Sequence, residues 1–271
     1  MSLKIGADPE FFLKREDKFV SAFGMIPGTK QAPHTVPRGA VQVDGMALEF
    51  NIEPASTSKE FVYNIDEVLK HLRTMVPTEF DFAFESVAFF EAAYMKKQDP
   101  MAVMLGCDPD FNVYTNEANE VPDSEENFRT AAGHIHLGWY DKPQKEIDDK
   151  HIMECRIMAK QLDFMLGVPS LIFDSDNKRR EMYGKAGTFR IKPYGMEYRV
   201  LSNFWLRSTE LMSWVYTHTD KAFTLLVEDG VNLYDLMGDV AKDVIDTHNV
   251  DRAKYLLDHE LNAYVDMEKV K

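Results

Sequence analysis

The first strand-forming stretch of the chain is Ile5-Gly6-Ala7-Asp8-Pro9-Glu10-Phe11-Phe12-Leu13, which places two carboxylates inside apolar sequence. Side chains two positions apart on a β-strand point to the same face of the sheet. The pattern therefore predicts a strand over residues 4–14 that is apolar on one face and carries Asp8 and Glu10 on the other. An Asp-Pro pair also favours a turn, but the apolar sequence beyond Glu10 continues the strand.

Three later stretches repeat this spacing of polar side chains within apolar sequence. They carry Glu49, Asn51 and Glu53; His134 and His136; and Glu197 and Arg199. A strand with one apolar face and one face of carboxylates or imidazoles should line a cavity. If the four strands form one sheet, we expect its concave face to collect about five carboxylates and two imidazoles. The ordinary alternatives are solvent-facing acids, half-buried histidines and a structural cross-strand ion pair.

So many carboxylates need counter-charge, because like charges at close range raise one another's pKa and destabilise the fold. Oxygen ligands with one or two histidines suit Mg²⁺ or Mn²⁺ better than structural zinc, and such ions bind phosphate oxygens. The most basic segment of the chain holds Arg179, Arg180, Lys185, Arg190, Lys192 and Arg199, although its first two arginines also fit a solvated loop. The simplest interpretation is therefore a site in which metals and arginines hold ATP.

The composition describes a globular protein with a large core. Of 271 residues, 45% are hydrophobic, which argues against disorder and against a disulfide-stapled mini-protein. A formal net charge of −14 makes nucleic acid and anionic membranes poor partners for the surface as a whole. No apolar stretch approaches the roughly 20 residues of a membrane helix, and the N-terminus lacks a signal-peptide pattern. Cys107 and Cys155 lie far apart, which indicates a reducing, cytoplasmic setting.

The first half of the chain reads mainly as strands and the second mainly as helices, which favours an α+β fold. We expect one domain over residues 1–271, with residues 203–271 as a C-terminal helical part. Strands are expected at residues 4–14, 19–23, 40–54, 134–139, 188–192 and 196–202, with short strands between 79 and 127. Helices are expected from the capping box at Thr57 to Pro77, and after Pro143 to a C-cap at Gly167. Residues 24–39 and 174–187 read as loops.

Taken as a set, these motifs resemble the glutamine synthetase-like superfamily. Residues 5–13 look like its opening strand, and Glu49 and Glu53 look like the next metal carboxylates. The stretch Ala132-Gly133-His134-Ile135-His136 is similar to its Gly-x-His-x-His strand, and residues 188–199 are similar to its paired terminal strands. The order of these motifs and the residues in them most resemble the phage-type amidoligases, described as carboxylate–amine ligases of the second type. The resemblance spans residues 5–205.

The resemblance implies a curved, mainly antiparallel sheet with a metal and ATP site on its concave face and helices on its outer side. It implies a ligase in which ATP phosphorylates a carboxylate and an amine then attacks the acyl phosphate to form an amide. Its partners would be ATP, a carboxylate, an amine and two or more Mg²⁺ or Mn²⁺ ions. The implied metal ligands are Asp8, Glu10, Glu49, Glu53, His134 and Glu197. The implied nucleotide-binding residues are Lys185, Arg190, Lys192, Arg199 and His136, and the implied catalytic residues are Glu49, Arg190 and Arg199.

Two other functions stay open at this level. A metal-dependent hydrolase would keep the metals and use a metal-bound water in place of ATP. A catalytically silent phage assembly or regulatory protein would keep the fold alone. The basic residues between 179 and 199 favour the ligase, because hydrolysis of a neutral substrate needs few phosphate-directed cations. The substrate pair and the oligomeric state also stay open, as does whether Asp108 and Asp110 form a turn or join the site.

Overall fold

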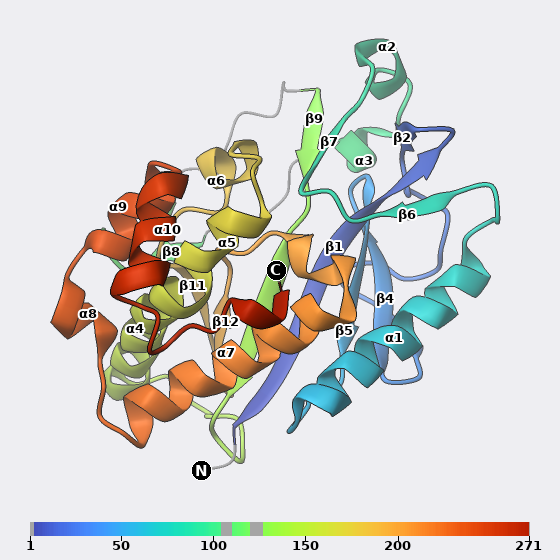
Figure 1. The fold of residues 1–271 in the computed structure, drawn as a ribbon. Coiled ribbons are helices and arrows are strands. Elements are labelled where there is room, and N and C mark those ends of the chain that lie inside the picture. The colour runs from blue at the N-terminus through green and yellow to red at the C-terminus, as the bar shows by residue number, and fades with distance from the viewer. Residues whose placement is uncertain (1–2, 104–109, 120–126, 271) are drawn as a thin grey trace.

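An antiparallel sheet organises the molecule, as the computed structural model shows for residues 3–103, 110–119 and 127–270 (Figure 1). Its strands lie in the order β3 (His34–Val36), β4 (Gly39–Asp44), β5 (Ala47–Ile52), β1 (Lys4–Arg15), β10 (Gly133–Gly138), β12 (Gly195–Tyr198), β11 (Thr188–Lys192) and β8 (Phe111–Asn112). Two short strands, β2 (Lys18–Val20) and β6 (Asp81–Ala83), also pair with β1, while β7 (Val87–Phe89) pairs with β9 (Phe128–Thr130). The predicted α+β class with a mainly antiparallel sheet is confirmed.

Helices cover one face of this sheet. The two longest, α1 (Ser58–Met75) and α7 (Thr209–Val227), pack against each other and lie in front of the strands in Figure 1. The others are α4 (Asp149–Leu162), α5 (Val168–Phe173), α8 (Leu233–Met237), α9 (Val240–Asp246) and α10 (Val250–His259). Alternation along β1 sends Ile5, Ala7 and Phe11 into the core beneath them, so Asp8 and Glu10 face the opposite side.

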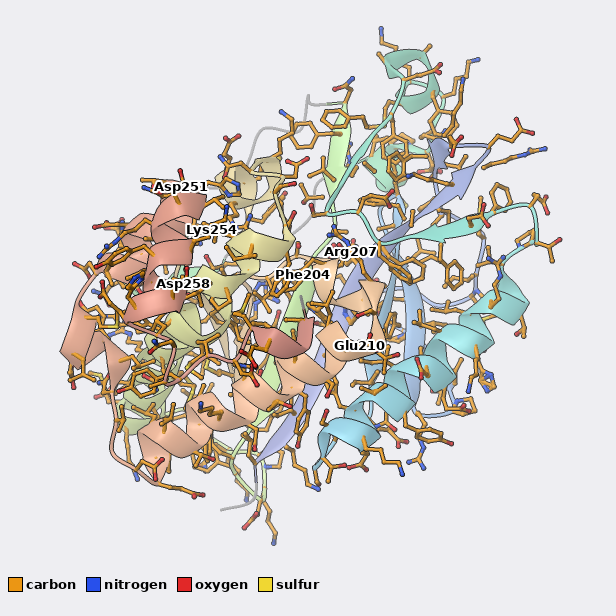
Figure 2. All side chains as sticks on the ribbon, in the orientation of Figure 1. Phe204, Arg207, Glu210, Asp251, Lys254 and Asp258 are labelled. Atoms are coloured by element: carbon orange, nitrogen blue, oxygen red, sulfur yellow. The ribbon has the colours of Figure 1, made fainter. Side chains whose placement is uncertain are left out.

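The outer side of the helical layer carries exposed charged side chains. Glu210 on α7 and Asp251, Lys254 and Asp258 on α10 point away from the core and are exposed (Figure 2). They are separate from the sheet face that carries Asp8 and Glu10. No helix in the part of the chain that the structure describes is both long and apolar enough to cross a bilayer.

The predicted single strand over residues 40–54 is wrong, because the chain reverses within it. Gly45 has a φ of +57°, a left-handed conformation that glycine adopts readily, and it closes a hairpin between β4 and β5. The Asp44-Gly45 pair is a recognised hairpin signal that the strand assignment overlooked. As a result β4 and β5 lie side by side, with Gln42 directly opposite Glu49.

The predicted helix end at Gly167 is also wrong. The chain passes from α4 through a π-helical turn, Asp163–Gly167, directly into α5, and Gly167 keeps a helical φ of −63°. A β-carbon at this position would lie 2.6 Å from Ile245 Cδ1 and 2.8 Å from the Tyr198 hydroxyl. The glycine is therefore explained by close packing of the helix against β12 and α9, and not by capping.

The remaining differences are local. The predicted loop over residues 24–39 contains β3, and the predicted loop over 174–187 contains α6 (Lys178–Met182). The region from 79 to 127 holds short helices as well as strands, namely α2 (Ala92–Met95) and α3 (Pro100–Val103). The strands predicted at 4–14, 134–139 and 188–192 and the helix after Thr57 are confirmed to within a few residues.

Candidate active site

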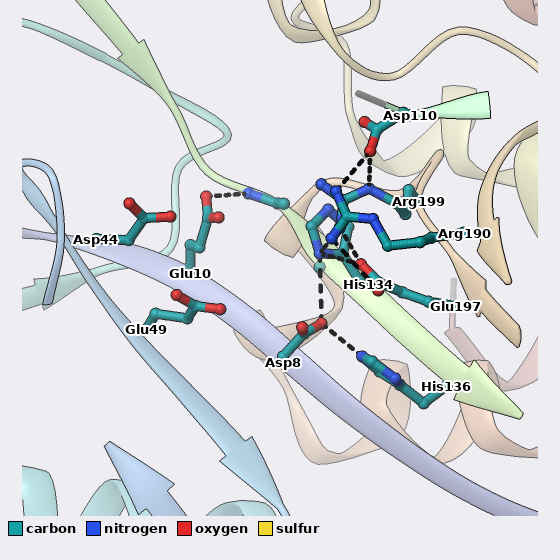
Figure 3. Close-up of polar contacts among 12 residues, drawn as sticks. Asp8, Glu10, Asp44, Glu49, Asp110, His134, His136, Arg190, Glu197 and Arg199 are labelled. Atoms are coloured by element: carbon teal, nitrogen blue, oxygen red, sulfur yellow. Dashed lines mark hydrogen bonds and ion pairs between the residues drawn. The ribbon is translucent and has the colours of Figure 1, made fainter. Parts of the chain in front are cut away.

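The register of four neighbouring strands brings the predicted polar residues together. Asp8 on β1 lies opposite His134 on β10, and His136 on β10 lies opposite Glu197 on β12. Glu197 in turn lies opposite Arg190 on β11. These side chains come from separate strands and converge on the face of the sheet that the helices leave open (Figure 3).

Three of these residues form a group with the chemistry of a divalent-cation site. Asp8, His136 and Glu197 each offer a ligand atom within 4.8 Å of the other two. Asp8 Oδ1 lies 3.0 Å from His136 Nε2, and Glu197 Oε2 lies 2.7 Å from Lys192 Nζ. Two carboxylates and an imidazole whose buried ligand atoms lie this close together fit Mg²⁺ or Mn²⁺.

The electrostatics keep the two carboxylates of this group ionised. Burial opposes ionisation of Asp8, but His136 and His134 hold its pKa well below the ordinary value. Burial and Asp8 likewise oppose ionisation of Glu197, but Arg199 and the two histidines lower its pKa to about 2. Burial lowers the pKa of His136, but Asp8 outweighs it and the pKa is raised overall, so a bound cation would have to displace a proton from this imidazole. Burial and the Arg199 guanidinium lower the pKa of the neighbouring His134 to about 4.

A cationic edge lies directly beside the metal-type group. Glu197 contacts Arg199 Nη1, Lys192 Nζ at 2.7 Å and Arg190 Nη1 at 3.8 Å. Asp110 holds the two arginines from the other side, at 2.7 Å from Arg199 Nε and 3.0 Å from Arg190 Nη2. Asp110 is buried, so it belongs to the site and is not a surface turn, whereas Asp108 lies outside the described residues. Arginine pairs of this kind suit phosphate oxygens.

A second acidic group lies along the same face. Glu10 faces Glu49 across β1 and β5, and Glu10 Oε2 accepts a hydrogen bond of 2.9 Å from the amide of Ala132. Burial, reinforced by Asp44, raises the pKa of Glu10 to about 7. Burial, reinforced by Asp8 and Glu10, raises the pKa of Glu49 well above its ordinary value. Burial is the larger cause of these raised pKa values, and the repulsion that we expected between crowded carboxylates adds to it.

Asp44 belongs to this group and is absent from the residues selected by sequence. Burial also raises its pKa, and Figure 3 shows its carboxylate directed toward that of Glu10. The Asp-Gly hairpin signal could have found it. With β4 recognised as a strand, the two-residue spacing places Asp44 on the same face as Gln42, whose Nε2 donates to Glu49 Oε2 at 2.6 Å.

The structure does not bring Glu53 or Lys185 to the site. Glu53 follows the end of β5, where strand alternation no longer applies, and its exposed side chain pairs with Arg38 at 3.1 Å. Lys185 is exposed ahead of β11. Arg179 and Arg180 also fitted a solvated loop by sequence, but the structure shows that both are buried. Arg179 donates to the carbonyl oxygens of Val200 and Arg199, and Arg180 donates to Ser170 Oγ.

Two cavities open along this face. The larger has a volume of about 670 Å³ and is lined by Asp8, Glu49, His136, Arg190, Lys192 and Glu197, among others. That volume is typical of a small-molecule or cofactor pocket. The second lies on the other side of His134 and is lined by Glu10, Asp44, Asp110, Arg179 and Arg199, among others. The metal-type group lines the larger cavity, whereas His134 and Arg199 line the second.

Residues 125–223 match a known ligase family. The match is to the family model described as phage phiEco32-like COOH.NH2 ligase-type 2, and it confirms the resemblance over this part of the chain. The matched segment contains His134, His136, Arg190, Glu197 and Arg199, so it carries the β10, β11 and β12 side of the site. No curated protein matches the chain.

Two solved structures are similar at a low level. One is a novel glutamine synthase homolog, with 12% identity and a TM-score of 0.40 over all of this chain and 68% of its own. The other is a bifunctional glutathione synthetase from Pasteurella multocida, with 10% identity and a TM-score of 0.41 over 95% of this chain. This chain covers less than half of that enzyme, 46%. Similarity at this level does not decide the activity.

Proposed function

We propose that the chain is an ATP-dependent carboxylate–amine ligase that works through an acyl phosphate. The family match supports formation of a bond between a carboxylate and an amine as the general chemistry. The observation that carries the finer proposal is the convergence of Asp8, His136 and Glu197 beside the Arg190 and Arg199 guanidiniums. Glu197 belongs to the metal-type group and also contacts the two arginines that could bind phosphate. This arrangement suits a metal–nucleotide complex.

Asp8, His136 and Glu197 would hold Mg²⁺ or Mn²⁺, and Glu10 and Glu49 with His134 would hold a further ion. The bound ions would neutralise charge on the phosphate oxygens. The close, buried ligand atoms of the first group and the raised pKa values of the second both fit this assignment. Tyr194 supports His136, since its hydroxyl lies 2.5 Å from His136 Nδ1 and leaves Nε2 directed toward Asp8.

The cationic residues would bind and orient the transferring phosphoryl group. Arg190 and Arg199 are held on both sides by Asp110 and Glu197, so little ordering of their side chains remains to be done on binding. Lys192 adds a third positive charge at Glu197. Fixed cations of this kind stabilise the charge that develops on the phosphoryl oxygens in the transition state, which is the main catalytic contribution in phosphoryl transfer.

The reaction has two balanced steps. In the first, a substrate carboxylate oxygen takes the terminal phosphoryl group of ATP, the bond to the bridging oxygen breaks, and ADP leaves. In the second, the amine nitrogen attacks the acyl carbon, the carbon–oxygen bond breaks, and inorganic phosphate leaves. The amine nitrogen loses protons to solvent as the amide forms.

ADP release measured together with new amide masses tests this proposal. The protein is incubated with Mg²⁺ and ATP against pooled amino acids, polyamines and short peptides. We expect amine-dependent ADP release that is lost in Glu197→Gln and kept in Glu210→Gln, a matched change on the exposed face of α7. Product formed without ATP would replace the ligase with a hydrolase, and the absence of both product and nucleotide binding would contradict any enzyme of this type.

A further inference from the structure

The smaller cavity is lined by side chains of both charges, and not all of them are joined in ion pairs. It receives Glu10 from β1, Asp44 from the end of β4 and Arg179 from α6. Charges from three separate elements are therefore gathered around one space. Asp44 and Arg179 both line this cavity, and neither has a role in the proposed ligase reaction.

Arg179 is a buried cation that forms no ion pair with the described residues, although Glu10 and Asp174 act on it at longer range. Only 2% of the residue is exposed, and burial lowers its pKa to about 10. Its Nη atoms donate to the carbonyl oxygens of Val200 at 2.7 Å and Arg199 at 3.1 Å, while Nε has no hydrogen bond. Within residues 3–103, 110–119 and 127–270, no carboxylate lies within 4.0 Å of this guanidinium. A buried guanidinium left in this state is costly unless an anion comes to it.

Asp44 presents the complementary charge. Its carboxylate is partly buried, and its ion pair with Lys30 is long, at 3.9 Å. It adjoins Glu10, whose carboxylate accepts a hydrogen bond from the Ala132 amide. With Glu10 given to a metal ion, Asp44 is the carboxylate of this cavity that a bound ammonium group would pair with.

We propose that this cavity binds a small zwitterion, with its carboxylate on Arg179 and its ammonium group on Asp44. The ligand would be the carboxylate-bearing substrate, so the inference rests on the proposed ligase function. Arg179 and Asp44 come from separate elements of the cavity wall. A ligand that carries both charges can pair with both residues, whereas a simple acid or a simple amine can pair with only one. This is the basis of selectivity in the cavity.

Calorimetric titration of the full chain in Mg²⁺ tests the inference. The probes are the standard amino acids and β-alanine, each compared with its analogue that lacks the amine and its analogue that lacks the carboxylate. We expect at least one zwitterion to bind more tightly than both of its analogues by roughly tenfold or more, the worth of one charge-assisted hydrogen bond. Equal binding of the analogue that lacks the amine would overturn the assignment.

Two substitutions locate the binding. Asp44→Asn should abolish the preference for the zwitterion over its amine-free analogue while keeping the affinity for that analogue. Arg179→Gln should weaken both, and Arg156→Gln on α4, outside both cavities, should change neither. If Arg179→Gln fails to fold because its carbonyl contacts are lost, the Asp44 comparison still decides. Wild-type selectivity in Asp44→Asn would contradict the proposal.

A separate titration with Mg²⁺–ATP distinguishes the two proposals. Nucleotide binding without binding of any zwitterion in the panel would overturn this inference and leave the ligase standing. Zwitterion binding that follows the pattern above, without any nucleotide binding, would overturn the ligase and support the cavity assignment.

Discussion

At the scale of single residues, Glu197 and Asp110 explain why so many charges are stable together. Glu197 is fully buried and contacts Arg199, Lys192 and Arg190, while Asp110 contacts both arginines again. Each carboxylate therefore neutralises and orients cations that would otherwise repel one another. The sequence could indicate Glu197 from its two-residue spacing, but Asp110 lay in a region without a clear pattern.

Asp110→Asn should lower kcat/KM for ATP by about 10²-fold, because it removes the charge that holds the two arginines side by side. Steady-state ADP release at varied ATP measures the effect. Asp110→Glu, which keeps the charge, should restore part of the activity. Kinetics equal to those of the wild-type chain in Asp110→Asn would show that the arginines need no such support.

Asp163 should make stability depend on pH. Burial raises its pKa to about 7, although the hydroxyls of Tyr198 and Tyr114 donate to it at 2.7 and 2.9 Å. The folded protein thus binds this proton more tightly than the unfolded chain, whose aspartate pKa is near 3.9. Stability from this group is complete below about pH 4 and is lost as the pH rises through about 7.

Comparison of Asp163→Asn with the wild type isolates this effect from other titrating groups. The difference in unfolding free energy between the two proteins should change by on the order of 4 kcal/mol from acid to neutral pH, in favour of the variant as the pH rises. Urea denaturation over that range measures it. A difference independent of pH would mean that Asp163 keeps an ordinary pKa in the fold.

At the scale of elements, strand alternation was the reliable signal and chain reversal was the weak one. The strand pattern correctly placed Asp8, Glu10, His134 and Glu197 on one face, because a period of two depends only on local geometry. It failed at residues 40–54, where a turn inside an apolar stretch was read as continuous strand. Register across strands is a tertiary property, so the pairing of Asp8 with His136 in one metal-type group had to come from the structure.

The hairpin at Gly45 should matter for the site as well as for stability. Gly45→Ala places a β-carbon in a left-handed conformation and 3.1 Å from the Ala102 carbonyl oxygen. We expect a loss of about 1–2 kcal/mol in unfolding free energy and weaker zwitterion binding through displaced Asp44.

Gly230→Ala is the matched control, since its φ of +70° is similar and nothing lies within 4 Å of the added carbon. Denaturation and calorimetry on both variants separate the general cost of backbone strain from the specific effect of moving Asp44. Equal effects of the two variants on binding would contradict the role given to the β4–β5 turn.

At the scale of the whole molecule, the sheet separates two environments. Its helical side forms the core, and its other side gathers carboxylates and cations into adjoining cavities. The net charge of −14 therefore has two parts, a solvated excess on the helices and a smaller set of acids that need cations. Because the acids on the open face of the sheet need cations, we expect divalent ions to stabilise the fold.

Mn²⁺ at about 100 times its dissociation constant should stabilise the wild-type chain by about 2.7 kcal/mol, since it binds the folded state alone. Thermal unfolding with matched NaCl as the control for ionic strength measures the shift. Asp8→Asn should lose most of it. An equal shift in the variant, or an equal shift with NaCl, would assign the stabilisation to surface charge.

Asp8, His136 and Glu197 are proposed to hold a divalent ion that binds ATP. Pulsed electron paramagnetic resonance of bound Mn²⁺ tests this directly, because nuclear couplings report which atoms touch the ion. We predict a nitrogen coupling that weakens in His136→Gln, where His134 still contributes its own, and a phosphorus coupling that appears when ATP is added. A bound Mn²⁺ ion whose spectrum is the same in His136→Gln, or is unchanged by ATP, would contradict this proposal.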